Sequence, residues 1–272
     1  MVLTVAQSAC VALPAAGVPA FLQRFRSGAW ALVAPLSIAA VIVAINWLPS
    51  SADVLTWAAL LLVPPGCALA LGWAAHGARP WAAAPAVPLL VVAWTSQDTR
   101  WGQAATIALI AGSCVTLGRL LAGAAPLLLL KLGIVAMAIV DSILVFGNEL
   151  QAPNAVLVAA VPGPGLPQLQ SASFGFAGLG YGDFFAAAVV GGILAAERGW
   201  RWQLGAAAAM IAVSLAWDQL FLVVDTIPAT VPPAIVLVGC EVLARMRTVR
   251  ASGPDARWAA PGATAARAAR HP

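Results

Sequence analysis

Charged residues are scarce in this sequence. Of 272 residues, 9% are charged and 62% are hydrophobic, and the mean hydropathy is +0.92. About a quarter of the residues of a soluble domain are charged, so this composition excludes an ordinary soluble fold. The net charge of +4 comes mainly from arginines in short connections and in the tail. In a membrane protein that pattern indicates orientation rather than nucleic-acid binding.

Metal-ligating and redox residues are also few. The two histidines lie in a connection and in the tail, which leaves histidine catalysis without a candidate. The four cysteines stand singly in apolar surroundings, without the spacing of a metal site: Cys10, Cys67, Cys114 and Cys240. We interpret them as small buried hydrophobes, and we expect neither a metal nor another cofactor.

Apolar runs are abundant instead, and they recur along nearly the whole chain. A helix of about 20 residues crosses the hydrocarbon of a bilayer. We therefore predict an all-α polytopic membrane protein, with one domain over residues 1–244 embedded in the lipid bilayer. The nine expected spans are residues 2–22, 29–48, 54–75, 81–95, 103–122, 127–146, 176–196, 202–224 and 227–243. Residues 245–272, rich in Arg and Ala, are expected to form a disordered cytoplasmic tail.

The arginines predict an orientation for these spans. No basic residue precedes residues 2–22, as one would in a signal peptide, whereas Arg24 and Arg26 follow them. If the N-terminus is outside and the C-terminus is cytoplasmic, Arg100 is the only basic residue in an outer connection. This agrees with the positive-inside rule and predicts a multi-pass protein of the cell membrane.

Two aspartates interrupt the apolar runs. Asp141 lies within residues 139–147, and Asp183 follows the glycine-rich stretch 178–182. An ionised carboxylate in hydrocarbon costs several kcal/mol, so such residues are rare unless they line a cavity or take part in chemistry. Glycines beside Asp183 let other backbone or a substrate approach closely.

The spacing places these acids at similar depth. Asp141 lies about six residues from the outer end of its span and Asp183 about seven from the outer end of the next, roughly 9–10 Å at the rise of an α-helix. Pro232-Pro233-Ala234 lies at nearly the same level of the last span. Two facing carboxylates share a proton, so one can activate water while the other protonates a carbonyl or an amine, as in aspartic proteases.

Another function fits the same residues. Intramembrane acids also couple protons or ions in transporters, and Asp218 in the expected eighth span would be a third such acid. A hydrogen bond between Asp218 and a neighbouring helix is the more common arrangement.

Several short motifs resemble those of a known family. Gly180-Tyr181-Gly182-Asp183, Val140-Asp141 and Pro233-Ala234-Ile235 are similar to the Gly-x-Gly-Asp, Tyr-Asp and Pro-Ala-Leu motifs of presenilins and signal peptide peptidases. The resemblance covers roughly residues 130–240 and implies a presenilin-like fold of nine spans. It implies that Asp141 and Asp183 form a catalytic dyad, and that Gly180, Tyr181, Gly182, Pro233, Ala234 and Ile235 support it. The expected substrates are transmembrane helices or remnant signal peptides. Val140 and Ile235 depart from the family pattern.

Two further interpretations stay open. Prepilin peptidases also combine Gly-x-Gly-Asp with an earlier membrane-embedded Asp, but their site is cytoplasmic, and they usually follow the first Asp with a polar stretch containing proline. Here Ser-Ile-Leu-Val-Phe follows Asp141. The second interpretation is a family relative that has lost activity and only binds membrane helices.

A transmembrane substrate must unwind before it can be cut, because its helix satisfies every backbone group internally. The freed groups can pair with a strand edge of the enzyme. The expected edges are residues 178–182, Val156–Val161 and the segment around Pro232 and Pro233, within or after a long connection over residues 147–173.

Overall fold

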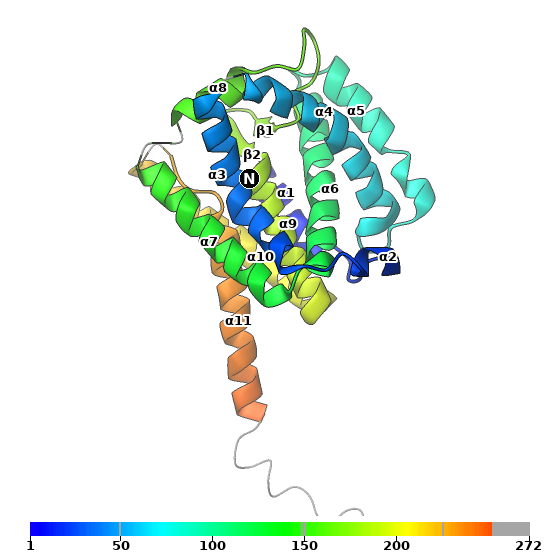
Figure 1. The fold of residues 1–272 in the computed structure, drawn as a ribbon, viewed down its shortest axis with the longest axis vertical. Coiled ribbons are helices and arrows are strands. Elements are labelled where there is room, and N and C mark those ends of the chain that lie inside the picture. The colour runs from blue at the N-terminus through cyan, green and yellow to red at the C-terminus, as the bar shows by residue number, and fades with distance from the viewer. Residues whose placement is uncertain (49, 148, 150, 225, 252–272) are drawn as a thin grey trace, which may run out of the picture. The chain divides into compact units, whose positions relative to one another are not determined.

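The computed structural model of the chain describes residues 1–251 except 49, 148, 150 and 225. These residues form helices and one two-stranded antiparallel hairpin (Figure 1). The α-helices are α1 (Val2–Ala12), α2 (Ala20–Gln23), α3 (Val33–Trp47), α4 (Ser51–Leu69), α5 (Ala86–Thr95), α6 (Arg100–Ala124), α7 (Leu127–Phe146), α8 (Gln151–Ala159), α9 (Tyr181–Glu197), α10 (Trp200–Trp217) and α11 (Val231–Ala251). Shorter helical turns are η1 (Gly28–Leu32), η2 (Ala70–Ala74), η3 (Pro80–Ala83) and η4 (Asp218–Leu222), and the strands are β1 (Ser171–Phe174) and β2 (Ala177–Gly180). The predicted helical class is confirmed.

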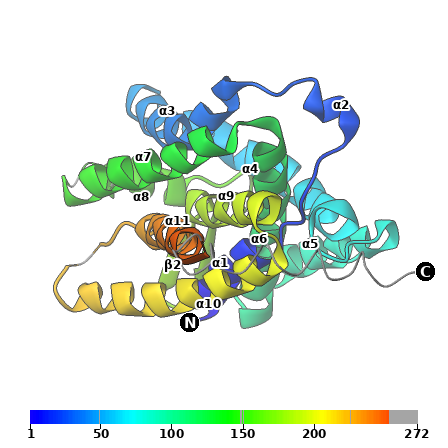
Figure 2. The same ribbon diagram turned by 90° about the horizontal axis from the view of Figure 1, so that it is seen from below.

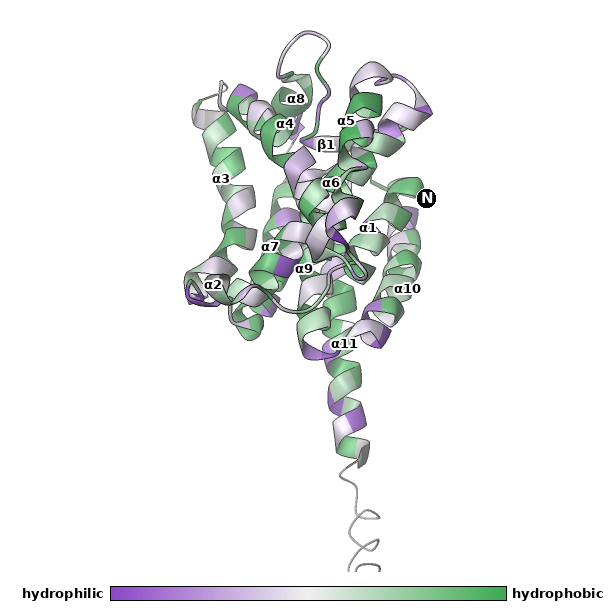
Figure 3. Cartoon of the chain, turned by 90° about the vertical axis from the view of Figure 1, so that its right-hand side faces the viewer, coloured by the Kyte–Doolittle hydropathy of each residue, from purple (hydrophilic) through white to green (hydrophobic). Residues whose placement is uncertain are grey.

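Four described helical segments are long and apolar enough to cross a membrane. They are Ser51–Ala74, Arg100–Ala124, Leu127–Phe146 and Trp200–Leu222. Large apolar side chains are exposed on them, for example Leu62 at 68% and Ile143 at 65%. Monomeric soluble proteins rarely expose extended apolar surface, so these helices are compatible with a lipid environment. Figure 3 shows apolar residues along the helices, with hydrophilic residues mainly near helix ends and connections.

The prediction of nine spans is wrong for the described residues. The first expected span, 2–22, ends as a helix at Ala12, because Pro14 and Pro19 cannot continue regular helix. The expected seventh span, 176–196, is helical only from Tyr181, because its first residues form β2. The described helices therefore do not reproduce the presenilin-like fold that the motifs implied.

The C-terminal segment also differs from its prediction. Helix α11 continues to Ala251, so residues 245–251 are helical rather than disordered. Alanine and arginine are strong helix formers, and they extend the helix beyond its apolar part. Residues 252–272 of the expected tail lie outside the described residues. The chain divides into two compact units after Leu237, and the unit Met1–Leu237 contains both Asp141 and Asp183.

Helix α9 is the packing centre of the unit Met1–Leu237. It contacts α1, α6, α7 and α10 (Figure 2). Every residue from Phe184 to Ala195 is buried. A helix that is apolar on all sides belongs inside a bundle. The packing of α9 therefore fixes the position of Asp183 in its first turn.

Glycines bring α9 unusually close to its neighbours. A Cβ at Gly118 of α6 would collide with the Ala188 carbonyl, and one at Gly192 of α9 would collide with the Gly118 carbonyl. On another side of α9, a Cβ at Gly191 would meet the carbonyls of Cys10 and Val11 in α1. Small residues allow this backbone approach between membrane helices, and here they clamp α9 between α1 and α6.

Candidate active site

Asp141 is a buried carboxylate on α7, with 9% of its surface exposed. Its Oδ2 accepts a hydrogen bond of 2.6 Å from the Thr230 hydroxyl and one of 3.4 Å from the Thr230 backbone N–H. Thr230 is itself 2% exposed. The partner lies 89 residues away in the sequence, so the orientation of Asp141 depends on tertiary contacts.

Asp183 is held by its own neighbours in the chain. It is the third residue of α9, and its Oδ2 accepts a 2.9 Å hydrogen bond from the Gly180 N–H. This is the half of a capping box in which the side chain at N3 binds the N-cap backbone. A carboxylate in the first turn also interacts favourably with the helix dipole. The spacing Gly-x-Gly-Asp therefore builds a helix start that fixes the carboxylate.

The depth predicted for Asp183 needs correction. The residues before Tyr181 are strand and not helix, so Asp183 lies in the first turn of α9 rather than about two turns inside it. Its side chain is half-buried. Gly180 leaves room for this arrangement, because a Cβ there would approach Asp183 Oδ2 to 3.3 Å.

The fold brings the two acids together. The Gln7 amide bonds both to the Asp183 carbonyl and to the carbonyl of Ala229, whose neighbour Thr230 holds Asp141. A Cβ at Gly182 would lie 3.7 Å from the terminal methyl of Met137, which precedes Asp141 by about one helical turn. The start of α9 thus packs on α7 at the level of the carboxylates.

The motif Pro233-Ala234-Ile235 lies near the start of α11, a helix that begins directly after Thr230. Pro233 and Ala234 are buried, and the Ala234 N–H donates to the Thr230 carbonyl at 3.4 Å. Ile235 is 43% exposed, so its side chain is not part of the buried group around Asp141. Pro233 and Ala234 therefore lie beside the site. Ile235 is part of the motif in the sequence, but its side chain lies outside the site.

Gln7 of α1 connects the two halves of the site. Its Nε2 donates to the Asp183 carbonyl at 3.2 Å and to the Ala229 carbonyl at 3.3 Å. The side chain is 4% exposed. One amide group thus joins the first turn of α9 to the segment that carries Thr230.

Tyr181 faces α6 rather than the carboxylates. Its hydroxyl and that of Ser113 are 2.8 Å apart and share a hydrogen bond. The contact fixes the start of α9 against α6, so the supporting role expected for Tyr181 would be exerted through the position of that helix.

The sequence reasoning missed Thr230 and Gln7. Thr230 precedes Val231 and the two prolines, and nothing in its immediate neighbourhood distinguishes it from an ordinary loop threonine. Gln7 carried a usable signal, since it is an amide inside the apolar stretch of residues 2–12. A buried amide needs hydrogen-bond partners, and that requirement could have directed attention to it.

Other polar groups lie apart from this pair. Asp218 is exposed at the start of η4, and it does not join Asp141 and Asp183. Within the described residues, no group of three or more His, Cys, Asp or Glu side chains is arranged to hold a metal.

Comparisons of the chain with protein-family models, with curated proteins and with solved structures found no match. The chemistry must therefore be inferred from the site itself. Two neighbouring carboxylates, one fixed by two donors and the other by one, can divide the tasks of base and acid between them.

Proposed function

We propose that the chain is an intramembrane aspartyl protease that hydrolyses peptide bonds within or near transmembrane segments. The observation that carries the proposal is the neighbouring pair Asp141 and Asp183, each fixed by hydrogen bonds inside an apolar chain. The resemblance of their motifs to those of presenilins and signal peptide peptidases supports it. The proposal rests on the pair and not on the number of spans.

The two donors of Thr230 favour the carboxylate form of Asp141, which acts as the base. Asp183 then carries the shared proton. Water attacks the scissile carbonyl, Asp141 takes the proton of the water, and Asp183 protonates the carbonyl oxygen. The resulting diol collapses: the C–N bond breaks, Asp141 protonates the leaving nitrogen, and Asp183 recovers a proton from the diol. Both carboxyl groups return to their starting states.

The substrate would be held as an added strand on β2. This strand is mostly exposed, and it leads directly to Asp183. The Tyr181 N–H donates to the Gln170 carbonyl at 3.2 Å, which sets the alternation of hydrogen-bonded pairs in the hairpin. Because Gly178 pairs with Ser173, its backbone groups face away from β1. Of the three edges expected from the sequence, residues 178–180 are in a strand, whereas 156–159 belong to α8 and Pro232-Pro233 to α11.

The variant Gly178→Pro tests this mode of binding. Proline would remove only an outward N–H, which an edge strand tolerates, so cleavage should fall while thermal stability stays close to that of the wild type. Gly178→Ala keeps the N–H and has room for its Cβ, which would lie 3.9 Å from the Ala172 carbonyl. Equal cleavage by the two variants would argue against strand addition.

The proposal includes the orientation predicted from the arginines. A reporter fused after Arg250 should be cytoplasmic, and one inserted near Gly165 should be external. The opposite result at both positions would favour the prepilin-peptidase interpretation, whose site faces the cytoplasm.

The decisive experiment uses the purified protein in liposomes with transmembrane reporter peptides, and products are identified by mass spectrometry. We expect a cut inside or beside the span, and inhibition by a peptide that carries a hydroxyl-bearing mimic of the tetrahedral intermediate. Ion flux without cleavage would instead support a transporter. Reporter binding without cleavage by the wild type would indicate a relative without activity.

A further inference from the structure

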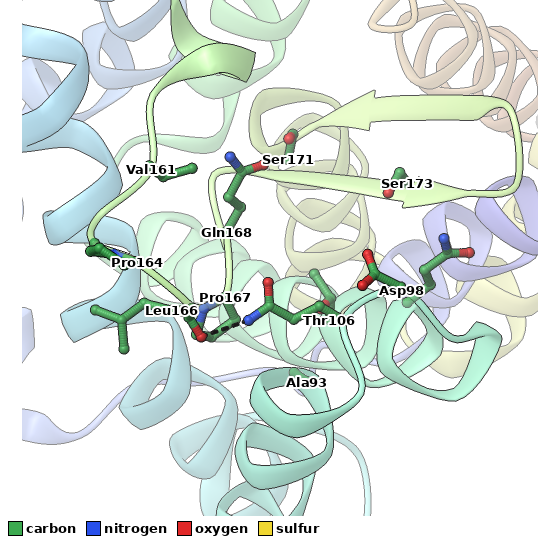
Figure 4. Close-up of a pocket in the computed structure, with 14 residues that line it drawn as sticks. Ala93, Asp98, Thr106, Val161, Pro164, Leu166, Pro167, Gln168, Ser171 and Ser173 are labelled. Atoms are coloured by element: carbon green, nitrogen blue, oxygen red, sulfur yellow. Dashed lines mark hydrogen bonds between the residues drawn. The ribbon is translucent and has the colours of Figure 1, made fainter.

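A polar cavity lies beside the hairpin, and the proposed chemistry does not use it. Its volume is about 430 Å³, within the range of small-ligand sites. The wall is formed by β1, by the loop around residues 161–168 and by the connection between α5 and α6. In a chain that is 62% hydrophobic, polar side chains are concentrated here: Asp98, Gln103, Thr106, Gln168, Ser171 and Ser173. Figure 4 shows the two serines on the strand side and Asp98 and Thr106 on the helix side.

The walls of the cavity are tied together by amide groups. Gln97 donates to the Gly165 carbonyl at 2.8 Å and fixes the loop to the end of α5. Gln168 donates to the carbonyls of Val158 and Ala160 at 3.3 and 3.2 Å. The cavity is therefore a built part of the fold.

Polar groups on the wall remain available to a ligand. Among the described residues, Asp98 has no hydrogen bond or ion pair, and Arg100 close by does not pair with it. Ser171 and Ser173 pair with Gly180 and Gly178 across the hairpin, at positions whose backbone N–H and C=O turn away from β2. Within the described part of the chain, one wall thus offers a strand edge without a backbone partner and the other an exposed carboxylate.

The cavity is close to the acids. Ser171 lies opposite Gly180, three residues before Asp183. An extended peptide advances about 3.3 Å per residue. The substrate segment would lie along the outer edge of β2 and the cavity lies beyond β1, so residues that pass the hairpin turn, about seven or more positions from the scissile bond, could reach the cavity.

We propose that this cavity binds the polar segment flanking a transmembrane substrate, and that Asp98 selects a basic side chain or an amine in that segment. The inference rests on the proposed protease function and specifies its substrates. Among the described residues that line the cavity, Asp98 is the only ionisable one, so an acidic flank would meet an unfavourable charge, and a basic flank would find a partner.

Three reporter peptides test the selection. They share one transmembrane segment and carry Lys, Ala or Glu at about seven to ten positions from the cut. We expect the Lys reporter to have a KM about two- to fivefold below that of the Ala reporter, and the Glu reporter to have a higher KM than either. Asp98→Asn should remove the difference, and Asp98→Lys should reverse it. The matched control is Asp53→Asn, an exposed acid in the first turn of α4 outside the cavity, which should keep the preference.

A binding measurement separates this inference from the protease proposal. Fluorescence anisotropy with the Asp183→Asn protein in nanodiscs reports affinity for the same three peptides without turnover. If no reporter is cut but binding follows the order Lys, Ala, Glu and depends on Asp98, the protease proposal fails and the cavity assignment stands. If reporters are cut with equal KM, or if Asp98→Asn keeps the preference, the cavity assignment is overturned.

Discussion

Helices α7 and α9 each carry one of the two acids, and they fix them in opposite ways. Asp183 is held within a few residues, through the Gly180 N–H and the buried helix that follows. Asp141 is held by Thr230, which is 89 residues away. Around the acids, α9 is buried on all sides, whereas α7 exposes apolar residues such as Ile139 and Ile143. An acid that is fixed by its own neighbours in the chain can be recognised from a short motif. An acid that is fixed by a distant residue shows in the sequence only as a carboxylate within an apolar run.

The largest loss of cleavage is expected when either acid is replaced, and the two variants test whether Asp141 and Asp183 act as one catalytic pair. Asp141→Asn and Asp183→Asn should each lower cleavage by about 10²- to 10⁴-fold, because each carboxyl moves a different proton. Thermal unfolding should change little, since an amide oxygen can still accept from Thr230 or from Gly180. Asp218→Asn, at an exposed acid, should retain activity. A single variant at position 141 or 183 with full activity would reject the dyad.

Bulk on α9 should have the next largest effect, because that helix has no free side. Gly192→Leu would force a side chain into the Gly118 backbone and should lower the free energy of unfolding by about 3 kcal/mol. Gly205→Leu on α10 has open space around its Cβ, so it provides the matched control and should be tolerated. Equal stability of the two variants, measured by chemical denaturation, would contradict the central position of α9.

Removal of Thr230 tests the long-range support of Asp141. Thr230→Val should lower kcat about 10- to 100-fold with little change in KM, because the carboxylate loses its strongest donor and its orientation. Thr230→Ser keeps the hydroxyl and should restore most of kcat. If serine and valine have the same kcat, Thr230 has only a packing role.

Gln7 connects the first turn of α9, which carries Asp183, to the segment of Thr230, which holds Asp141. Its replacement should therefore affect the support of both acids. Gln7→Leu leaves two carbonyls without their donor and should lower the free energy of unfolding by about 1–2 kcal/mol, with a few-fold loss of kcat. The control Gln219→Leu removes an exposed amide that bonds only within its own helical region. Its effect on unfolding should stay within about 0.5 kcal/mol.

The smallest effect is expected at Tyr181, which belongs to the motif but faces α6. Tyr181→Phe removes one hydrogen bond to Ser113 and should reduce the free energy of unfolding by about 1 kcal/mol. Cleavage by this variant should stay within about twofold of the wild type. A large loss of kcat at unchanged stability would mean that the hydroxyl takes part in the reaction.

The sequence by itself determined the helical class and which two acids to examine. Scarce charge and long apolar runs predict helices, and the four long apolar helices of the described residues are compatible with a membrane protein. The spacing of Gly180, Gly182 and Asp183 acts within a few residues. It favours a helix start with a carboxylate at the third position. The range 127–146 was also predictable, because proline before it and glycine after it stop the helix.

Tertiary structure decided the rest. Apolar runs do not reveal where a helix begins when extended backbone is equally apolar, so the sequence predicts helix over residues 176–180, although Ala177–Gly180 pair with β1. The partners Thr230 and Gln7 lie far from Asp141 and Asp183 in the chain, and only packing around α9 brings them within hydrogen-bond distance. A cavity formed by three separate segments has no pattern in any one of them. Local rules act over a few residues, whereas a site is assembled from contacts whose partners the sequence does not mark.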